Sequence, residues 1–364
     1  MSENKKPDHV RLFIPGPIEV RKEVLEAQGE WMIGHRSADF EALFARVQPK
    51  LRQVFYTKSR VYISTSSGSG LWEAASRNCI RDDKKVLHLV NGAFSERWAD
   101  VSRSNGKKVD VVEAEWGKAV KPEQLEAQLK KESYDAVALV LNETSTGVKN
   151  PLEAMVKIIK KYPDTLILVD AVSIFGGYKI DFDGLGLDVL LTSTQKALAL
   201  PPGLAFGAVS DRALERAKNV SNRGFYFDFL ELEKFMLKNN TPSTPNISLI
   251  YATDKELDYM LAEGLEARFA RHQKLAEMTR AWASGCGFSM FSEEGYHSPT
   301  VSTIANTRNS DIKGLNKYLA TQGMTLSDGY GKLKEKTFRI AHMGDLTAND
   351  MQDLFNAINT FLSK

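Results

Sequence analysis

Short apolar runs alternate with amphipathic stretches between residues 61 and 191. The runs are rich in Val, Ile and Leu, which is typical of strands buried on both faces of a parallel sheet. The stretches between them place apolar residues at helical spacing. The pattern therefore predicts an α/β fold in which a mostly parallel sheet carries helices on both faces. The expected strands are 61–63, 85–90, 109–112, 136–141, 165–169 and 188–191, and the expected helices are 71–80, 122–131 and 151–161.

The C-terminal part follows a different pattern. Residues 255–284 form one long amphipathic stretch, which predicts a single helix at the hinge between a large and a small domain. Beyond it we expect strands near 300–304 and 337–340 and helices near 312–321 and 347–362, which together make a small α+β domain. The expected division is an N-terminal segment, 1–20, that packs with the small domain, a large domain over 21–254 and the small domain over 255–364.

Composition narrows the class of protein. The 364 residues are 43% hydrophobic and 26% charged, the profile of a soluble, enzyme-sized chain. A net charge of +2 gives no electrostatic reason to expect a nucleic-acid or membrane partner. The first residues lack a signal-peptide stretch and no run reaches the roughly 18 apolar residues of a membrane span, so a cytoplasmic location is expected. Two cysteines, Cys79 and Cys286, exclude a disulfide framework, and six histidines without ligand spacing argue against a metal site.

An aspartate and a lysine each follow one of the predicted strands. Strand 165–169 ends on Asp170, and strand 188–191 runs into a Thr-Ser-Thr-Gln segment that ends on Lys196. Ligands of parallel α/β sheets bind beyond the carboxyl ends of the strands, so both side chains are expected at one edge. A lysine that forms a Schiff base and a carboxylate that keeps a pyridine nitrogen protonated are the minimal requirements for pyridoxal phosphate. An ordinary surface lysine is the alternative, and the small hydroxyl residues and apolar stretch around Lys196 argue against it.

Residues 64–70, Ser-Thr-Ser-Ser-Gly-Ser-Gly, lead from a predicted strand into a predicted helix. Such a loop exposes backbone amides at a helix N-terminus, where the helix dipole favours a phosphate. A flexible loop without a ligand is the alternative. The segment is neither a Walker loop nor a dinucleotide fingerprint, so nucleotide binding is not favoured.

Three further features have both a structural and a functional interpretation. Phe94 follows a strand end, where its ring either lies on an aromatic cofactor or belongs to the core. Arg339 stands in a strand between Phe338 and Ile340 and needs an anionic partner, which is a structural carboxylate or that of a substrate. The loop 239–245 contains two prolines and several hydroxyls, and it is either a linker or part of a site.

These features in chain order resemble the class V aminotransferases of pyridoxal-phosphate fold type I, and within them the alanine/serine–glyoxylate (or pyruvate) aminotransferase group. The resemblance covers nearly the whole chain from Phe13 onward. The fold it implies is a mostly parallel seven-stranded sheet with helices on both faces and a small α+β C-terminal domain. The motifs that carry it are PGP at 15–17, GHRS at 34–37, SSGSG at 66–70, NGAF at 91–94, ETSTGV at 143–148, VDAVSIFGG at 169–177, STQKAL at 193–198, PPG at 201–203 and FRIAHMG at 338–344.

The resemblance also implies roles for individual residues. Lys196 would form the Schiff base with pyridoxal 5′-phosphate and, once free, would carry a proton during the reaction. Asp170 would pair with the ring nitrogen, and Arg339 would bind the substrate carboxylate with help from the backbone of Gly16. The remaining residues would surround the cofactor: Ser67, Gly68, Ser69 and Gln195 at the phosphate, Val172 under the ring, Phe94 on its other side and Thr144 at the phenolic oxygen.

The same resemblance places the hydroxyls of Thr241 and Thr244 at the cofactor phosphate of a neighbouring subunit, so a homodimer with shared active sites is expected. The glyoxylate group commonly has tryptophan where Phe94 stands, which is a departure in this chain. No second arginine stands in an obvious motif, and this favours small neutral amino donors. The predicted reaction moves an amino group from alanine or serine to glyoxylate or pyruvate.

Three alternatives remain at this point. A cysteine desulfurase-like lyase needs a nucleophilic cysteine on a flexible loop, whereas Cys79 lies in a predicted helix and Cys286 at the end of another. An aminotransferase for 2-aminoethylphosphonate or phosphoserine needs further basic residues near the site. A non-catalytic cofactor-binding protein does not need Lys196, Asp170 and Arg339 together.

Overall fold

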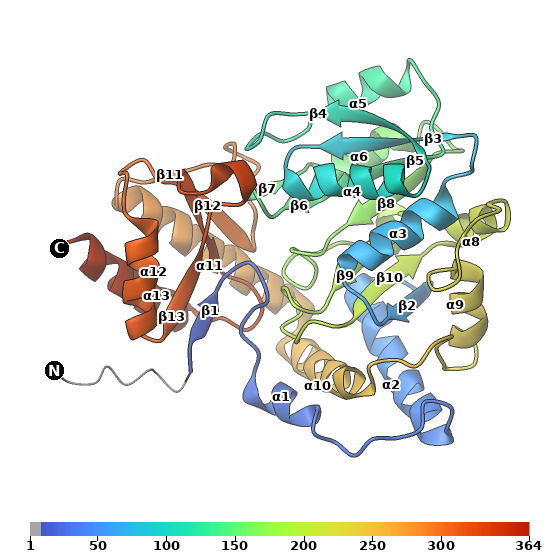
Figure 1. Ribbon diagram of the computed structural model, residues 1–364, viewed down its shortest axis with the longest axis horizontal. Coiled ribbons are helices and arrows are strands. Elements are labelled where there is room, and N and C mark those ends of the chain that lie inside the picture. The colour runs from blue at the N-terminus through green and yellow to red at the C-terminus, as the bar shows by residue number, and fades with distance from the viewer. Residues whose placement is uncertain (1–8, 364) are drawn as a thin grey trace.

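The computed structural model describes residues 9–363 and is built around two sheets, each with its own apolar core (Figure 1). The larger sheet has seven strands in the order β2-β10-β9-β8-β5-β3-β4, and every pairing is parallel except those of β10 with β2 and β9. The mostly parallel seven-stranded sheet is therefore confirmed. Its strands are β2 (Arg60–Ser64), β3 (Lys85–Val90), β4 (Lys108–Glu113), β5 (Ala136–Val140), β8 (Leu166–Asp170), β9 (Val189–Ser193) and β10 (Ala205–Val209).

The central strands explain the apolar runs in the sequence. Every residue of β5, β8, β9 and β10 is buried, because helices pack against the sheet and leave these strands no solvated side. Strand β10 was not predicted, although its sequence, AFGAV, is apolar throughout. The helices of this part are α1 (Lys22–Ala27), α2 (Ala38–Phe55), α3 (Gly68–Cys79), α4 (Ala93–Ser104), α5 (Pro122–Leu129), α6 (Leu152–Ile159), α7 (Phe182–Leu185), α8 (Asp211–Lys218) and α9 (Phe229–Met236), and a short hairpin joins β6 (Asn142–Glu143) to β7 (Val148–Lys149).

The smaller sheet has five strands in the order β1-β13-β14-β12-β11. The first of them comes from the N-terminal segment, since β1 (Arg11–Phe13) pairs in parallel with β13 (Met324–Asp328). The predicted strands and helices of this region are present as β12 (Val301–Ala305), β14 (Thr337–Ala341), α12 (Ile312–Thr321) and α13 (Ala348–Leu362). The short elements β1, β11 (Ser289–Met290), β13 and the 3₁₀ turn η1 (Gly331–Leu333) were not predicted. Residues 1–8 of the expected N-terminal segment lie outside the described part.

The single helix expected over 255–284 is wrong. The structure has two helices, α10 (Ile247–Glu263) and α11 (Leu265–Gly285), which meet at Gly264. The φ of Gly264 is +85°, a left-handed value that ends α10 and that a residue with a Cβ adopts only under strain. The expected boundary after residue 254 falls inside α10, and Leu257 and Met260 belong to the larger core. The two cores therefore part after the break at Gly264.

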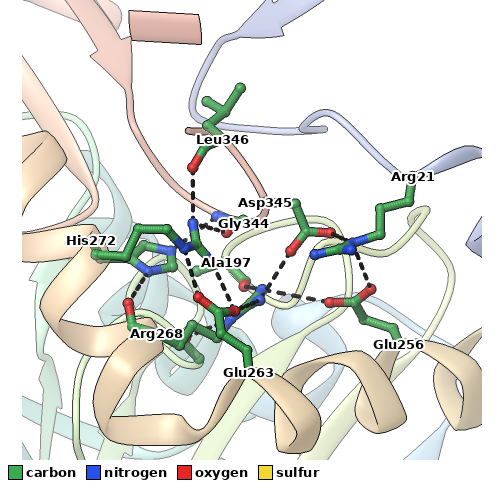
Figure 2. Close-up of polar contacts among 11 residues, drawn as sticks. Arg21, Ala197, Glu256, Glu263, Arg268, His272, Gly344, Asp345 and Leu346 are labelled. Carbon is green, nitrogen blue, oxygen red and sulfur yellow. Dashed lines mark hydrogen bonds and ion pairs between the residues drawn. The ribbon is translucent and has the colours of Figure 1, made fainter. Parts of the chain in front are cut away.

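A buried arginine on α11 joins segments of both parts (Figure 2). Arg268 is fully buried, and its guanidinium lies 3.0 Å from Glu263 and 2.9 Å from Asp345, which follows β14. The same group donates to the carbonyl oxygens of Gly176 at 3.2 Å and Ala197 at 3.0 Å. Because Ala197 is the neighbour of Lys196, Arg268 fixes the loop of that lysine to the small domain.

The cluster continues to the N-terminal segment and to α10. Arg21 donates to Asp345 at 2.5 Å and lies 4.0 Å from Glu256, a fully buried carboxyl group of α10 (Figure 2). Burial raises the pKa of Glu256, with the charge of Asp345 acting in the same direction.

Among the described residues, no helix is long and apolar enough to cross a membrane.

We expect Arg268→Met to lower the free energy of unfolding by about 3–5 kcal/mol, because removing one partner of a buried ion pair leaves the other charge without compensation. Urea unfolding followed by tryptophan fluorescence measures this loss. Lys274→Met on the exposed side of the same helix is the matched control, with an expected change of less than about 0.5 kcal/mol. Equal effects of the two substitutions would contradict the structural role of Arg268.

Candidate active site

A cavity of about 170 Å³ lies at the carboxyl ends of β8 and β9. This is the edge at which the sequence places Asp170 and Lys196, and both side chains line the cavity. The structure thus brings together most of the predicted site residues: Ser67, Gly68, Ser69, Phe94, Thr144, Asp170, Val172, Gln195 and Lys196. Four further residues line it that the sequence did not single out: Trp72, Val140, Asn142 and Ser193.

Asp170 ends β8 and has only 3% of its surface exposed. One carboxylate oxygen accepts from the backbone N–H of Val172 and the other from the indole N–H of Trp72, both at 2.6 Å. Burial nevertheless raises the pKa of Asp170 to about 7, because a charged carboxylate loses its hydration there. A buried acid of this kind requires a cationic partner in order to ionise fully.

Trp72 is a functional residue that the sequence reading missed. It lies on α3, one helical turn after Gly68, so its side chain points toward the same cavity as the loop that begins the helix. Its ring also stacks on Trp98, with 6.1 Å between the ring centroids. The i, i+4 spacing from the glycine of a phosphate-type loop was a signal that could have identified it.

Lys196 faces the same cavity from the loop after β9. Its ammonium group donates to the carbonyl oxygen of Pro15. Burial lowers the pKa of Lys196 to about 8, and the positive charge of Arg339 acts in the same direction. A Cβ on Gly16 would lie 2.5 Å from the Nζ of Lys196, so only glycine permits this approach, and its φ of +131° also favours glycine. A lysine with a lowered pKa has a larger neutral fraction and is a better nucleophile.

Another part of the cavity lining, from the start of α3 and the segment before Lys196, fits a phosphate. Gly68 begins α3, and a Cβ there would lie 2.5 Å from the side chain of Val172. The buried oxygens Ser193 Oγ and Gln195 Oε1 have no hydrogen-bond partner within the described part of the chain. Buried polar atoms are normally satisfied, so these two are available to a ligand. Together with the helix N-terminus, they fit the phosphate of pyridoxal phosphate.

Glu143 is a buried residue that contacts the segment of Phe94 and has no role predicted from the sequence. Its fully buried carboxylate accepts from the backbone N–H groups of Phe94 at 3.3 Å and Ser95 at 2.9 Å, which begin α4. It also accepts from the hydroxyl of Ser145 at 2.6 Å. A carboxylate at the N-terminus of a helix stabilises that helix. Here the contact also holds Phe94 in its position at the cavity.

Arg339 lies next to the cavity on β14 of the smaller sheet. Its guanidinium donates to the carbonyl oxygens of Asp328 at 3.2 Å and Thr144 at 3.5 Å. Within residues 9–363 no carboxylate lies in ion-pair distance of Arg339, although only 8% of the residue is exposed. Burial lowers the pKa of Arg339 to about 10. The structural salt bridge considered above is absent there, and a buried guanidinium in this state favours an anionic ligand.

The two predicted threonines do not join this cavity within the chain. Thr241 is buried and donates to the carbonyl oxygen of Ser243 at 2.9 Å, whereas Thr244 is exposed, with its hydroxyl 3.4 Å from His35. Arg36 holds their loop by donating to the carbonyl oxygen of Thr241 at 2.5 Å. A role for these hydroxyls at the cofactor therefore requires a second subunit.

Comparisons with known proteins agree on one family. Residues 20–334 match the model described as aminotransferase class-V. An uncharacterized aminotransferase of Methanocaldococcus jannaschii is 38% identical and covers 92% of this chain and 87% of its own length. The small subunit of a soluble hydrogenase of Synechococcus is 34% identical, and the match covers 98% of this chain and 94% of the relative. A serine–glyoxylate aminotransferase of Methylorubrum extorquens is 33% identical, and the match covers 95% of this chain and 89% of the relative. The solved structure of an alanine–glyoxylate aminotransferase from Nostoc sp. is similar with a TM-score of 0.92 at 29% identity, over 100% of this chain and 97% of that one.

The raised pKa of Asp170 predicts that the free energy of unfolding of the cofactor-free protein depends on pH. The folded state keeps a proton that the unfolded chain loses near its ordinary value of 3.8, so stability falls as the pH rises toward 7. A neutral amide in place of this carboxyl group has no such proton to lose. The stability of Asp170→Asn relative to the wild type should therefore rise by about 2–3 kcal/mol between about pH 5 and pH 8.

Urea unfolding of the cofactor-free proteins at both pH values measures this difference. Asp135→Asn is the control, because Arg81 and Arg216 lower the pKa of Asp135 despite its burial and it stays ionised over this range. Its stability relative to the wild type should not change with pH. A constant difference for Asp170→Asn as well would contradict the raised pKa.

Proposed function

Because the chain belongs to the class V aminotransferase family, we propose that it moves an amino group from a small amino acid, alanine or serine, to a small 2-oxo acid, glyoxylate or pyruvate. We propose pyridoxal 5′-phosphate as its cofactor. The observation that carries the proposal is that the buried Asp170 at the end of β8 and the half-buried Lys196 in the loop after β9 face one cavity.

The residues divide the work by their positions. When bound, pyridoxal phosphate supplies the electron sink for the reaction. Lys196 would attach the cofactor covalently and then carry the proton that leaves the α-carbon of the donor on its Nζ. Asp170 would hold a proton on the ring nitrogen, and the resulting positive charge would allow this buried carboxyl group to ionise.

The substrate would be held from the other sheet. The Arg339 guanidinium has N–H groups beyond those that contact the two carbonyl oxygens, and a carboxylate accepts from them in a bidentate manner. The charged residues that line the cavity are Asp170 and Lys196. A donor with a second acidic group would find no cation besides Lys196 among the residues that line the cavity, which supports a small neutral donor.

The cysteines do not support a lyase. Cys79 is fully buried in α3 and Cys286 follows α11, and neither lines the cavity. Burial raises the pKa of both thiols, which reduces the thiolate fraction that such chemistry requires.

The proposal is tested with ¹⁵N-labelled alanine or serine and unlabelled glyoxylate, added to the protein loaded with pyridoxal phosphate. We expect ¹⁵N-glycine, and Lys196→Ala should reduce its formation by about three orders of magnitude, because both attachment and proton transfer depend on this amine. Borohydride should fix the cofactor to the peptide that contains Lys196 in the wild type. Lys157→Ala on the exposed side of α6 is the control and should behave like the wild type. Transfer at the wild-type rate by Lys196→Ala would refute the assignment.

We also propose that the active form is a homodimer with shared sites. Trp31 and Met32 are 92% and 65% exposed, which is unusual for large apolar side chains. The backbone of Trp31 accepts from Tyr251 at 3.3 Å, and Arg36 of the same loop region holds the segment of Thr241. An exposed apolar surface thus lies beside the hydroxyl loop that has no role in its own cavity. A two-fold contact there would cover the apolar side chains and bring the threonines to the partner's phosphate.

Mixing two inactive variants tests the shared site. One chain carries Lys196→Ala and the other Thr241→Ala with Thr244→Ala, so a hybrid dimer has one intact site. After random subunit exchange about half of the dimers are hybrids, and about a quarter of the wild-type activity should return. Exchange is verified by native mass spectrometry. If hybrids form and activity does not return, each site is complete within one chain.

A cytoplasmic location and the lack of nucleic-acid and membrane partners stay predictions from the sequence.

A further inference from the structure

Tyr330 lies between the two residues that flank the proposed substrate position. It precedes η1 in the smaller part of the molecule and is half-buried. Its ring centroid is 5.1 Å from that of Phe94, at the start of α4. The guanidinium carbon of Arg339 lies 5.4 Å from the centre of the same ring. One side chain therefore contacts both the aromatic residue of the cavity and the arginine beside it.

The position of Tyr330 is fixed from both parts of the chain. Arg97 donates to its hydroxyl at 2.9 Å, and the same guanidinium lies 5.7 Å from the centre of the Phe94 ring. In the same turn as Tyr330, the Nζ of Lys332 lies 4.0 Å from the centre of the Trp116 ring. A Cβ on Gly329 would meet the backbone of Leu333 at 2.0 Å, so this turn requires glycine. These contacts hold the turn around Tyr330 against the start of α4.

We propose that Tyr330 is a positioning and specificity-determining residue, which holds the Arg339 guanidinium and limits the side chain of the amino donor to a small size. The inference rests on the proposed function. A donor whose carboxylate is bound by Arg339 and whose amino group reaches Lys196 has its α-carbon between these two residues. Its side chain then leaves beside the surface that Phe94 and Tyr330 form together. The phenol ring, which contacts Phe94 of the cavity lining, would then limit the room for a longer side chain.

The aromatic ring also orients the arginine. Two of its N–H groups donate to the carbonyl oxygens of Asp328 and Thr144, and its guanidinium carbon lies over the ring of Tyr330, 5.4 Å from the centroid. An aromatic face attracts a guanidinium and keeps its plane in place, which leaves the remaining N–H groups directed at a ligand. Loss of the Tyr330 ring would let the guanidinium of Arg339 change its orientation without changing its charge.

The test compares Tyr330→Leu, which removes the ring, with Tyr330→Phe, which removes only the contact to Arg97. For each, kcat/KM is measured for alanine and for the longer norvaline. We expect Tyr330→Leu to raise the norvaline-to-alanine ratio about tenfold and the KM for alanine and pyruvate about tenfold. Tyr330→Phe should keep the ratio within about twofold. Because both donors are measured on one preparation, a loss of folded or loaded protein cancels from the ratio.

Binding of the unreactive acids propanoate and pentanoate by calorimetry gives the same comparison without turnover. Their ratio of dissociation constants should shift in Tyr330→Leu in favour of pentanoate. Tyr296→Leu, another half-buried aromatic that contacts Lys121 away from the cavity, is the control and should leave both ratios unchanged. Unchanged ratios in Tyr330→Leu would overturn the inference. A wild type that binds these acids but transfers no amino group would instead refute the proposed function.

Discussion

The structure depends on a carboxylate that is kept out of water at the end of a central strand. Strands flank β8 on both sides, and the carboxylate of Asp170 accepts from the N–H groups of Val172 and Trp72, while the charge of Lys196 also favours its ionised form. The raised pKa shows that these contacts do not fully replace hydration. Such a site reduces stability unless a cation completes it, and a protonated pyridine nitrogen is a cation of the required size. The cost of burying Asp170 is therefore best understood as part of the proposed activity.

The other half of the site is assembled from distant segments. Lys196 lies in the loop after β9 of the larger sheet, where the turn at Gly16 contacts it and Arg268 fixes the carbonyl of Ala197 to the small domain. Arg339 reaches the same region from the smaller sheet, and its contact with Thr144 joins it to the hairpin of β6 and β7. A change in the relative position of the two sheets would move the lysine loop and the arginine together. Under the proposed function, this arrangement would couple the attachment of the cofactor at Lys196 to the binding of a substrate carboxylate at Arg339.

The sequence predicted the parts of the fold that local patterns determine. Buried parallel strands are apolar runs, so β3, β5, β8 and β9 were found, whereas β1, β11 and β13 are too short and mixed to differ from loops. The break between α10 and α11 depends on one glycine within a continuous amphipathic pattern. Lys196 and Asp170 could be placed because strand ends of a parallel sheet share an edge. Glu143 could not, since it acts through contacts with Phe94 and Ser95 of a distant segment, whereas the spacing of Trp72 from Gly68 was a signal within one helix.

The state of the ring nitrogen tests the central claim most directly. Pyridoxal 5′-phosphate labelled with ¹⁵N in the ring is bound to the wild type and to Asp170→Asn, and the nitrogen chemical shift is measured by NMR. The account predicts a protonated nitrogen in the wild type between about pH 6 and pH 9 and an unprotonated one in the variant, because a carboxylate stabilises the charge and a neutral amide does not. The same unprotonated nitrogen in both proteins would contradict the role of Asp170 on which this account rests.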